Sequence, residues 1–347
     1  MATGTVGRED QKGHWAGLDV AKATFDAALV RRGQGFGDTA LREVPVETFA
    51  RTRQGVGLFV AWLEAQGVEV DEVRVVMEAT GPFSTELAVW MLEECAALSP
   101  AIVNPRHTAS FLKSLGVRNK TDRLEARGLA FFGMERRPKA YEPVCAGRAE
   151  LRELSRHRDA LVRERTMVKN RMENKSTSAY VRRDLKRHLE QLDQRIARAE
   201  AAMKKCVDKS DELKRDVALL DSIYGVAFIN ATTILAELGD LRRFDRARQL
   251  SAYAGMSPRQ HESGASVHGR SRLCKQGNPR VRQCLYLSAM VAIRGNNALA
   301  SAYRKLIESG KRPMVALAAV MRKLLTLMRA ILISGKPYDP MWKTSRA

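Results

Sequence analysis

The first strong hydrophobic pattern in the chain is a pair of short apolar runs, residues 15–22 and 24–30, that follow each other at once. Short apolar runs joined by so brief a connection predict two strands in a hairpin. Asp19 lies inside the first run. Burying a carboxylate among apolar side chains is costly unless a positive or hydrogen-bonding group meets it, so Asp19 is a candidate metal ligand. The alternative is an ordinary aspartate at the strand end that accepts hydrogen bonds from backbone N–H groups in the turn.

Downstream, the pattern alternates between the periods of strands and helices as far as residue 140. It predicts strands at residues 41–46, 73–81 and 101–103, and helices at residues 49–63, 84–96 and 108–115. Such alternation predicts an α/β domain whose sheet is covered by helices on both faces. Glu78 lies at the C-terminal end of the second of these strands, and ligand sites in open α/β sheets gather where strands end.

A third source of carboxylates is a predicted helix start at residues 119–127, which carries Asp122 and Glu125. Residues three apart share one face of a helix, so these two acids are able to converge with Asp19 and Glu78. The alternative is a variant of the capping box, with Asp122 as N-cap and Glu125 as its partner, which needs no metal. Basic residues crowd the same segment, among them Lys120 and Arg123, and they suit a phosphate backbone that passes a metal-bound carboxylate cluster.

The overall charge points to a polyanionic partner. The chain has 347 residues with 59 Lys and Arg against 39 Asp and Glu, a net charge of +20. So strong a basic excess is typical of proteins that bind nucleic acid. A membrane surface is the competing polyanion, but the longest apolar run near the C-terminus, residues 314–321, is too short to span a bilayer.

The N-terminus lacks the apolar core of a signal peptide, so we expect a cytoplasmic protein that associates with the nucleoid when active. The five cysteines include no CxxC pair, and the six histidines do not cluster at zinc spacing. Reduced thiols, with neither disulfides nor structural zinc, are the simplest expectation.

The pattern changes to long helices after a proline-containing linker at residues 138–147. Apolar residues recur at alternating four- and three-residue steps, as in Leu185, Leu189, Leu192 and Ile196, which indicates a coiled-coil seam. A polar stretch at residues 173–178 predicts a turn and therefore an antiparallel hairpin. Both contact with nucleic acid and pairing between protomers are open uses of this hairpin.

The last part of the chain begins with residues 223–238, which resemble a helix-hairpin-helix that holds backbone phosphate. Residues 260–272 are rich in glycine and serine and have no apolar periodicity, so they are predicted to form a loop. Basic residues are concentrated in and around this loop, against the single acid Glu262, and predict phosphate contacts: Arg259, Arg270, Arg272, Lys275, Arg280 and Arg282.

Three motifs in the first part of the chain carry a resemblance to a known family: GLD at residues 17–19, MEATG at 77–81 and NKTDRLEA at 119–126. The chain resembles, nearly end to end, the IS110 family of insertion-sequence transposases, relatives of the Piv and MooV invertases. The resemblance implies an α/β RuvC-like (RNase H-like) DEDD domain at residues 1–140, a helical coiled-coil hairpin at 141–215 and a mainly α transposase domain at 216–347.

The resemblance also implies the site residues. Mg²⁺ is expected to bind four carboxylates: Asp19, Glu78, Asp122 and Glu125. The family usually has aspartate at the fourth position, where Glu125 adds one methylene but remains an oxygen donor. The serine of the Glu-Ser-Gly triplet, Ser263, corresponds to the family's nucleophile, and the neighbouring Ser266 is expected to support the loop.

The implied function is a DNA recombinase of a mobile element that cuts and rejoins DNA through a covalent phosphoserine bond. A structured noncoding guide RNA is the implied partner beside donor and target DNA, because base pairing then carries sequence while the protein contacts backbone. We expect a homodimer that pairs into a tetramer. Two rivals are a metal-dependent junction resolvase or nuclease that uses water, with Ser263 only binding phosphate, and a non-catalytic nucleic-acid-binding scaffold.

Overall fold

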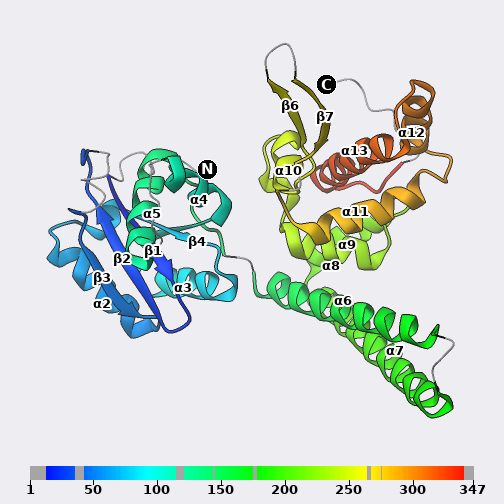
Figure 1. The fold of residues 1–347 in the computed structure, drawn as a ribbon, viewed down its shortest axis with the longest axis horizontal. Helices are drawn as coiled ribbons and strands as arrows, with labels where there is room; N and C mark the ends of the chain where they lie inside the picture. The colour runs from blue at the N-terminus through cyan, green and yellow to red at the C-terminus, as the bar shows by residue number, and fades with distance from the viewer. Residues whose placement is uncertain are drawn as a thin grey trace. The chain divides into compact units, whose positions relative to one another are not determined.

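A computed structural model describes residues 13–35, 43–114, 121–143, 145–174, 178–263, 267–274 and 276–339. The chain divides into two compact units, Met1–Pro143 and Val144–Ala347. The first unit is built around a sheet and the second is mostly helical, as the ribbon in Figure 1 shows.

A mixed five-stranded sheet forms the centre of the first unit. Its strands stand in the order β3-β2-β1-β4-β5. They are β1 His14–Val20, β2 Thr24–Val30, β3 Val46–Ala50, β4 Val73–Glu78 and β5 Ser99–Val103. β1 pairs antiparallel with β2, which confirms the predicted hairpin, and parallel with β4. β5 continues the parallel part of the sheet, so the carboxyl ends of β1, β4 and β5 meet at the same end of the sheet.

Helices cover both faces of this sheet: α2 Arg53–Ala65, α3 Gly81–Glu94, α4 Pro105–Ser114 and α5 Asp122–Arg136. Successive side chains of a strand point to opposite faces. Leu18 of β1 belongs to the core that includes α2 and α3, whereas Trp15 belongs to the core that includes α4 and α5. A short 3-10 helix, η2 Val70–Glu72, precedes β4. The predicted covering of both faces is confirmed.

The third strand lies later than the sequence pattern predicted. It is β3, Val46–Ala50, rather than residues 41–46, and α2 begins at Arg53 rather than at Phe49. The reason is that Phe49 packs against the apolar face of α2 from the neighbouring strand, with its ring 5.7 Å from that of Phe59. An apolar residue in a strand therefore continued the helical spacing by chance.

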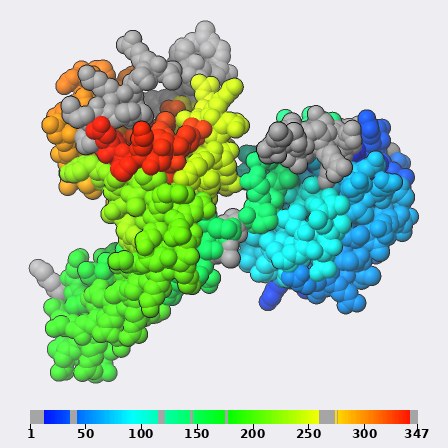
Figure 2. All heavy atoms as spheres, turned by 180° about the vertical axis from the view of Figure 1, so that it is seen from behind, coloured from blue at the N-terminus to red at the C-terminus, as the bar shows by residue number. Residues whose placement is uncertain are grey.

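Two long antiparallel helices open the second unit: α6 Ala146–Met172 and α7 Ala179–Asp208. Their shared apolar seam is buried, with Leu161 of α6 among Leu192 and Ile196 of α7. Arg158 and Arg165 interrupt the seam of α6 and instead pair across to α7, with Glu200 and Asp193, each at 2.9 Å. Figure 2 shows the helical pair as a green rod that protrudes from the rest of this unit.

The remaining helices pack around one core together with the base of α6 and α7. They are α8 Asp211–Asp221, α9 Phe228–Leu238, η3 Leu241–Arg243, α10 Ala247–Tyr253, α11 Pro279–Ala292, α12 Ala298–Glu308 and α13 Pro313–Ser334. Over the described ranges, no helix has both the length and the apolar character needed to cross a membrane.

The prediction of a loop at residues 260–272 is wrong, because the backbone there forms a two-stranded antiparallel hairpin. Its strands are β6 Pro258–Ser263 and β7 Val267–Leu273. Backbone pairing between two strands needs no apolar alternation, so hydrophobic periodicity carries no signal for such a hairpin.

Candidate active site

Close packing of α5 on β1 places Asp19 in the first unit. A Cβ at Gly17 would lie 2.1 Å from the carbonyl oxygen of Ala126 and 2.2 Å from the amide nitrogen of Ala130. Only glycine therefore lets the backbone of α5 rest directly on the strand. Asp19 is two residues further and faces the same side. The charges of Asp122 and Glu125, both in the first turn of α5, act on Asp19, so Asp19 lies near that turn.

Glu78 reaches the same region from the neighbouring parallel strand. Leu18 is in register with Met77, so Asp19 and Glu78 follow side by side at the carboxyl ends of β1 and β4. The Glu78 side chain accepts a hydrogen bond from the hydroxyl of Thr108, a residue of α4 that is only 1% exposed. A buried donor of this kind fixes the direction of the carboxylate.

The start of α5 decides between the two interpretations of Asp122. Thr121 is the N-cap, and its hydroxyl accepts a hydrogen bond from the amide of Leu124 at 3.3 Å. Asp122 is the first residue of the helix, so the alternative in which Asp122 caps the helix with Glu125 as its partner is wrong. The helix end is satisfied without either carboxylate in that role.

The carboxylates around Asp19 favour its protonated form. Partial burial raises the pKa of Asp19 from 3.8 to about 6, and the carboxylates of Glu125, Asp122, Glu78 and Asp26 add to the rise in that order. All three other predicted acids thus lie within electrostatic range of Asp19. Among the residues that the structure describes, no three His, Cys, Asp or Glu side chains are gathered tightly enough to hold a metal ion.

Asp26 is a neighbour of this site that sequence reasoning missed. It stands opposite Asp19 in the register of the β1–β2 hairpin and accepts a hydrogen bond from Thr48 of β3. The hairpin prediction contained the necessary signal, because residues 19 and 26 are equidistant from the turn. Asp26 therefore adds a further negative charge beside the predicted ligands.

The basic residues near these acids differ in their surroundings. Arg123 is exposed on the first turn of α5. Arg127 is partly buried and donates to the carbonyl oxygen of Val44 at 2.9 Å. Burial lowers the pKa of Arg127, and the charge of Arg123 lowers it further. Lys120 lies outside the described residues.

The hairpin of the second unit carries the predicted nucleophile. Ser263 is the last residue of β6 and pairs with Val267, so it stands at the closed end of the hairpin. Arg259 and Arg272 are directly opposite each other in register. Arg270 is also in β7. Ser266 and Lys275, and the side chains of the hairpin residues from 259 to 272, lie outside the described part.

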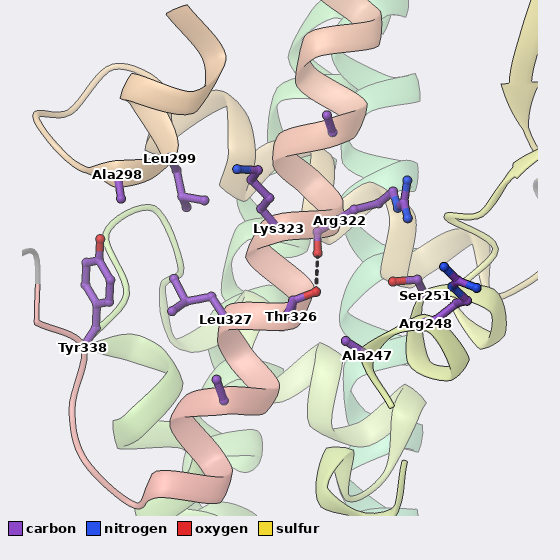
Figure 3. A pocket seen from close by; sticks show the side chains of 12 residues that line it. Ala247, Arg248, Ser251, Ala298, Leu299, Arg322, Lys323, Thr326, Leu327 and Tyr338 are labelled. Carbon is purple, nitrogen blue, oxygen red and sulfur yellow. Dashed lines mark hydrogen bonds between the residues drawn. The ribbon is translucent and has the colours of Figure 1, made fainter. Parts of the chain in front are cut away.

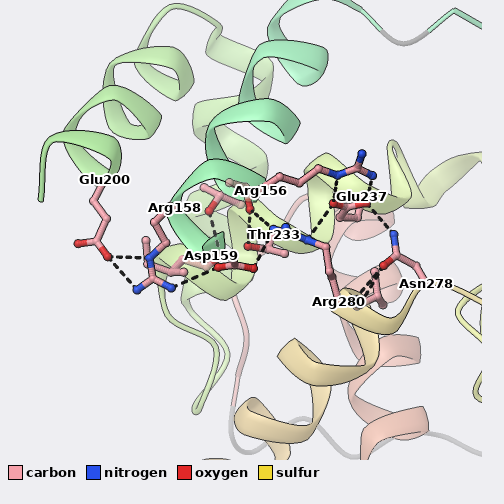
Figure 4. A network of polar contacts seen from close by, with 12 residues as sticks. Arg156, Arg158, Asp159, Glu200, Thr233, Glu237, Asn278 and Arg280 are labelled. Carbon is pink, nitrogen blue, oxygen red and sulfur yellow. Dashed lines mark hydrogen bonds and ion pairs between the residues drawn. The ribbon is translucent and has the colours of Figure 1, made fainter. Parts of the chain in front are cut away.

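A buried carboxylate holds the segment that follows this hairpin (Figure 4). Glu237 of α9 has a side chain only 1% exposed, and both its oxygens accept hydrogen bonds from Arg156, at 2.8 and 2.9 Å. The side chain of Asn278, the N-cap of α11, donates to Glu237 at 2.6 Å. Burial acts to raise the pKa of Glu237, but the bonds from Arg156 and Asn278 outweigh it and lower that pKa.

Two of the predicted phosphate-binding residues are engaged in the same region. Arg280 is 16% exposed, lies 3.0 Å from Glu237 and 2.9 Å from Asp159, and also donates to the hydroxyl of Ser155 at 2.9 Å. Arg282 donates to the carbonyl oxygen of Gly277 at 2.7 Å, and burial lowers its pKa. Arg280 thus ties the start of α11 to α6 and α9, whereas Arg282 holds the segment directly before α11.

Comparison with known proteins gives two matches in separate parts of the chain. Residues 16–180 match the DEDD transposase domain of IS110 elements, and residues 217–304 match the family described as Transposase IS116/IS110/IS902. The chain belongs to this transposase family. The first match spans the four predicted acids and the second spans Ser263 and the basic residues around it. A DEDD-type domain indicates dependence on a divalent metal.

Relatives of this family member include two invertases. The pilin gene-inverting proteins of Moraxella bovis and Moraxella lacunata are each 28% identical over 326 residues, 94% of this chain and 97% of the relative. The transposase of the insertion sequence IS1111A from Coxiella burnetii is 28% identical over 248 residues, 63% of this chain and 66% of the relative. The resemblance inferred from the three sequence motifs is confirmed.

Proposed function

We propose that this transposase is a Mg²⁺-dependent DNA recombinase of an insertion sequence, with a RuvC-like first unit and Ser263 as nucleophile. The observation that carries the proposal is the group of acids around Asp19, at the carboxyl ends of two parallel strands, in a chain of the IS110 family. A scaffold protein would have no use for neighbouring carboxylates that raise the pKa of Asp19.

The acids fit a hard divalent cation. All the donors are carboxylate oxygens, the ligand type that Mg²⁺ prefers, and they come from Asp19, Glu78, Asp122 and Glu125. Like charges repel, so the side chains stand apart unless a cation draws them together. When bound, Mg²⁺ would neutralise phosphate charge and favour loss of the serine proton. Thr108 holds Glu78, and Gly17 lets α5 bring Asp122 and Glu125 to Asp19.

Ser263 supplies the covalent step. Its Oγ attacks the phosphorus, the bond from phosphorus to the leaving deoxyribose oxygen breaks, and that oxygen takes up a proton. The DNA strand is then joined to Ser263 by a phosphodiester. A deoxyribose hydroxyl of the exchanged strand reverses the step, with Ser263 as the leaving group. Because the phosphodiester is conserved at each stage, rejoining needs no nucleotide cofactor.

The basic residues position the DNA backbone. Arg259 and Arg272 are opposite each other in the backbone register of the hairpin, and arginine is suited to binding phosphate. Arg270, Lys275, Lys120 and Arg123 extend the same role, whereas Arg280 supports α11 through its buried pairs. Backbone contacts carry no sequence information, so a structured guide RNA supplies target choice, and a homodimer that pairs into a tetramer joins two duplexes.

The deciding experiment is an adduct assay. Purified protein, Mg²⁺, the RNA encoded beside the gene and end-labelled target DNA are incubated, denatured and separated by size. We expect labelled protein with the wild type and with Ser266→Ala, the matched control, and none with Ser263→Ala. Asp19→Asn should abolish the adduct as well.

Cleaved DNA without a labelled protein in any variant would identify a water-dependent nuclease instead. An unchanged cleavage rate in Asp19→Asn would contradict the metal site. An adduct that persists in Ser263→Ala would assign the nucleophile to another residue.

A further inference from the structure

A groove on the second unit has no part in the chemistry proposed above. It runs over α13, between α10 on one side and α12 with Tyr338 on the other (Figure 3). We call it the α13 groove, and its volume is about 530 Å³. Its lining residues are Ala247, Arg248, Ser251, Ala298, Leu299, Ala319, Arg322, Lys323, Thr326, Leu327, Ala330 and Tyr338.

The floor of the α13 groove, which we call its bed, is apolar and open. Alanine occupies four of its lining positions, and small side chains leave room for a flat ring against α13. Leu299 and Leu327 add aliphatic surface. Tyr338 contributes an aromatic ring, and its backbone amide is held by the hydroxyl of Ser222 at 2.8 Å. A volume of this size accommodates a ligand much larger than a lone phosphate.

The charged groups along the α13 groove all have the same sign. Arg248, Arg322 and Lys323 are its charged lining residues in the described part of the chain, and no acid lines it there. Asp339 follows Tyr338 in the sequence but is not one of the lining residues. In Figure 3 the side chain of Arg322 points toward α10, near Ser251, and that of Lys323 points toward Leu299. The two cations therefore flank the apolar bed.

Arg322 has an unused hydrogen-bond donor. Its Nε is buried and has no hydrogen-bond partner among the described residues. A buried polar group without a partner is costly, and a ligand with an anionic acceptor would remove that cost. An aliphatic or purely aromatic ligand would leave it in place.

We propose that the α13 groove binds one unpaired nucleotide of a nucleic-acid strand. The base lies on the alanine and leucine bed beside Tyr338, and the flanking phosphates pair with Arg322 and with Arg248 or Lys323. Apolar surface for a base and cations for its phosphates are what single-stranded nucleic-acid sites combine. The net charge of +20 favours a nucleic acid over a small metabolite as the source. This inference is independent of Ser263 and of the metal.

The test compares DNA duplexes that differ at one position. Each carries a single bulge, either 2-aminopurine or an abasic residue, and a third duplex is fully paired; binding is measured by fluorescence anisotropy and by the emission of 2-aminopurine. We expect the wild type to bind the 2-aminopurine bulge about fivefold or more tightly than the abasic bulge, the effect of one stacked base. Parallel arms use the same bulge in RNA, and AMP alone.

Two variants distinguish the contribution of the base to binding from that of the phosphates. Ala319→Phe fills the bed and should remove the preference for a base over an abasic bulge, while Arg322→Gln should weaken binding to both. Arg304→Gln is the matched control, because it removes one positive charge from an exposed position of α12 outside the groove. It should leave the preference unchanged. If thermal melting shows that Ala319→Phe unfolds the protein, Ala330→Phe, three turns further along α13, provides the same test.

A preference for a base on DNA or on RNA that Ala319→Phe removes supports the proposal and identifies the strand. Equal affinity of the wild type for both bulges on both nucleic acids would overturn it. So would a preference that survives Ala319→Phe, or binding of AMP without any bulge preference. None of these outcomes bears on the adduct assay, which tests the proposed function separately.

Discussion

Asp19 is a predicted metal ligand whose ionisation is unfavourable in the folded protein. Its position in β1 partly buries the side chain, and four neighbouring carboxylates oppose its ionisation. A folded protein without a cation therefore holds this side chain protonated over a wider pH range than an unfolded chain does. The ionised site costs free energy of folding, and metal binding would offset that cost.

We predict that Asp19→Asn stabilises the metal-free protein at high pH. The pKa of Asp19 is about 6 in the folded state against 3.8 for the ordinary group. A raised carboxyl pKa means that stability falls as pH rises through this interval and stays lower above it. At pH 8 the free energy of unfolding of the variant should exceed that of the wild type by on the order of 1 kcal/mol, once solvent screening of this partly exposed group is included. Urea unfolding at pH 8 and pH 4 measures the difference.

The matched control for this prediction is Asp71→Asn, which removes an exposed acid of η2 away from the site. It should not reproduce the gain at pH 8. A loss of stability in Asp19→Asn that is equal at both pH values would show that Asp19 serves a purely structural hydrogen bond.

At the scale of elements, the contact between α5 and β1 assembles the acids of the first unit. At Gly17 the backbone of β1 contacts the backbone of α5. Backbone atoms cannot move aside as the end of a flexible side chain can. Glu78 joins it through strand register, and α4 supplies Thr108 to hold it. In the second unit, the buried Glu237 plays a comparable part, because it ties α6, α9 and the start of α11 together.

We predict that Gly17→Ala destabilises the first unit by about 2 kcal/mol or more, because overpacking at a rigid contact forces the backbone to shift. The new Cβ would lie 2.1 Å from the oxygen of Ala126 and must push α5 away from β1. Gly57→Ala is the control, since that helical glycine has nothing within 4 Å of its Cβ position. The control should be neutral or stabilise by up to about 1 kcal/mol through helix propensity. Chemical denaturation compares them, and equal effects would refute the contact.

At the scale of the whole molecule, the cores of the two units share no residue. The buried clusters of the first unit contain only residues before Pro143, and those of the second only residues after Val144. Each unit therefore has the apolar interior that an independent domain needs.

We predict that residues 1–143 fold as an isolated fragment with a cooperative thermal transition. Its midpoint should lie within about 5 °C of the corresponding transition of the full chain, a difference of about 1 kcal/mol for a unit of this size. Circular dichroism melts of the fragment and of the full chain provide the comparison. A fragment without a cooperative transition would show that the first unit depends on the second for stability.

The sequence by itself determined the family, the β1–β2 hairpin, the alternation of strands and helices and the antiparallel helical pair, because each of these has a local pattern or motif. Only the tertiary structure decided the rest. Phe49 belongs to β3 although its spacing suits α2, since packing across elements imitates helical periodicity. The β6–β7 hairpin is held by backbone pairing that hydrophobicity does not record. Thr121 rather than Asp122 caps α5, and the α13 groove gathers residues from 247 to 338 that no local pattern connects.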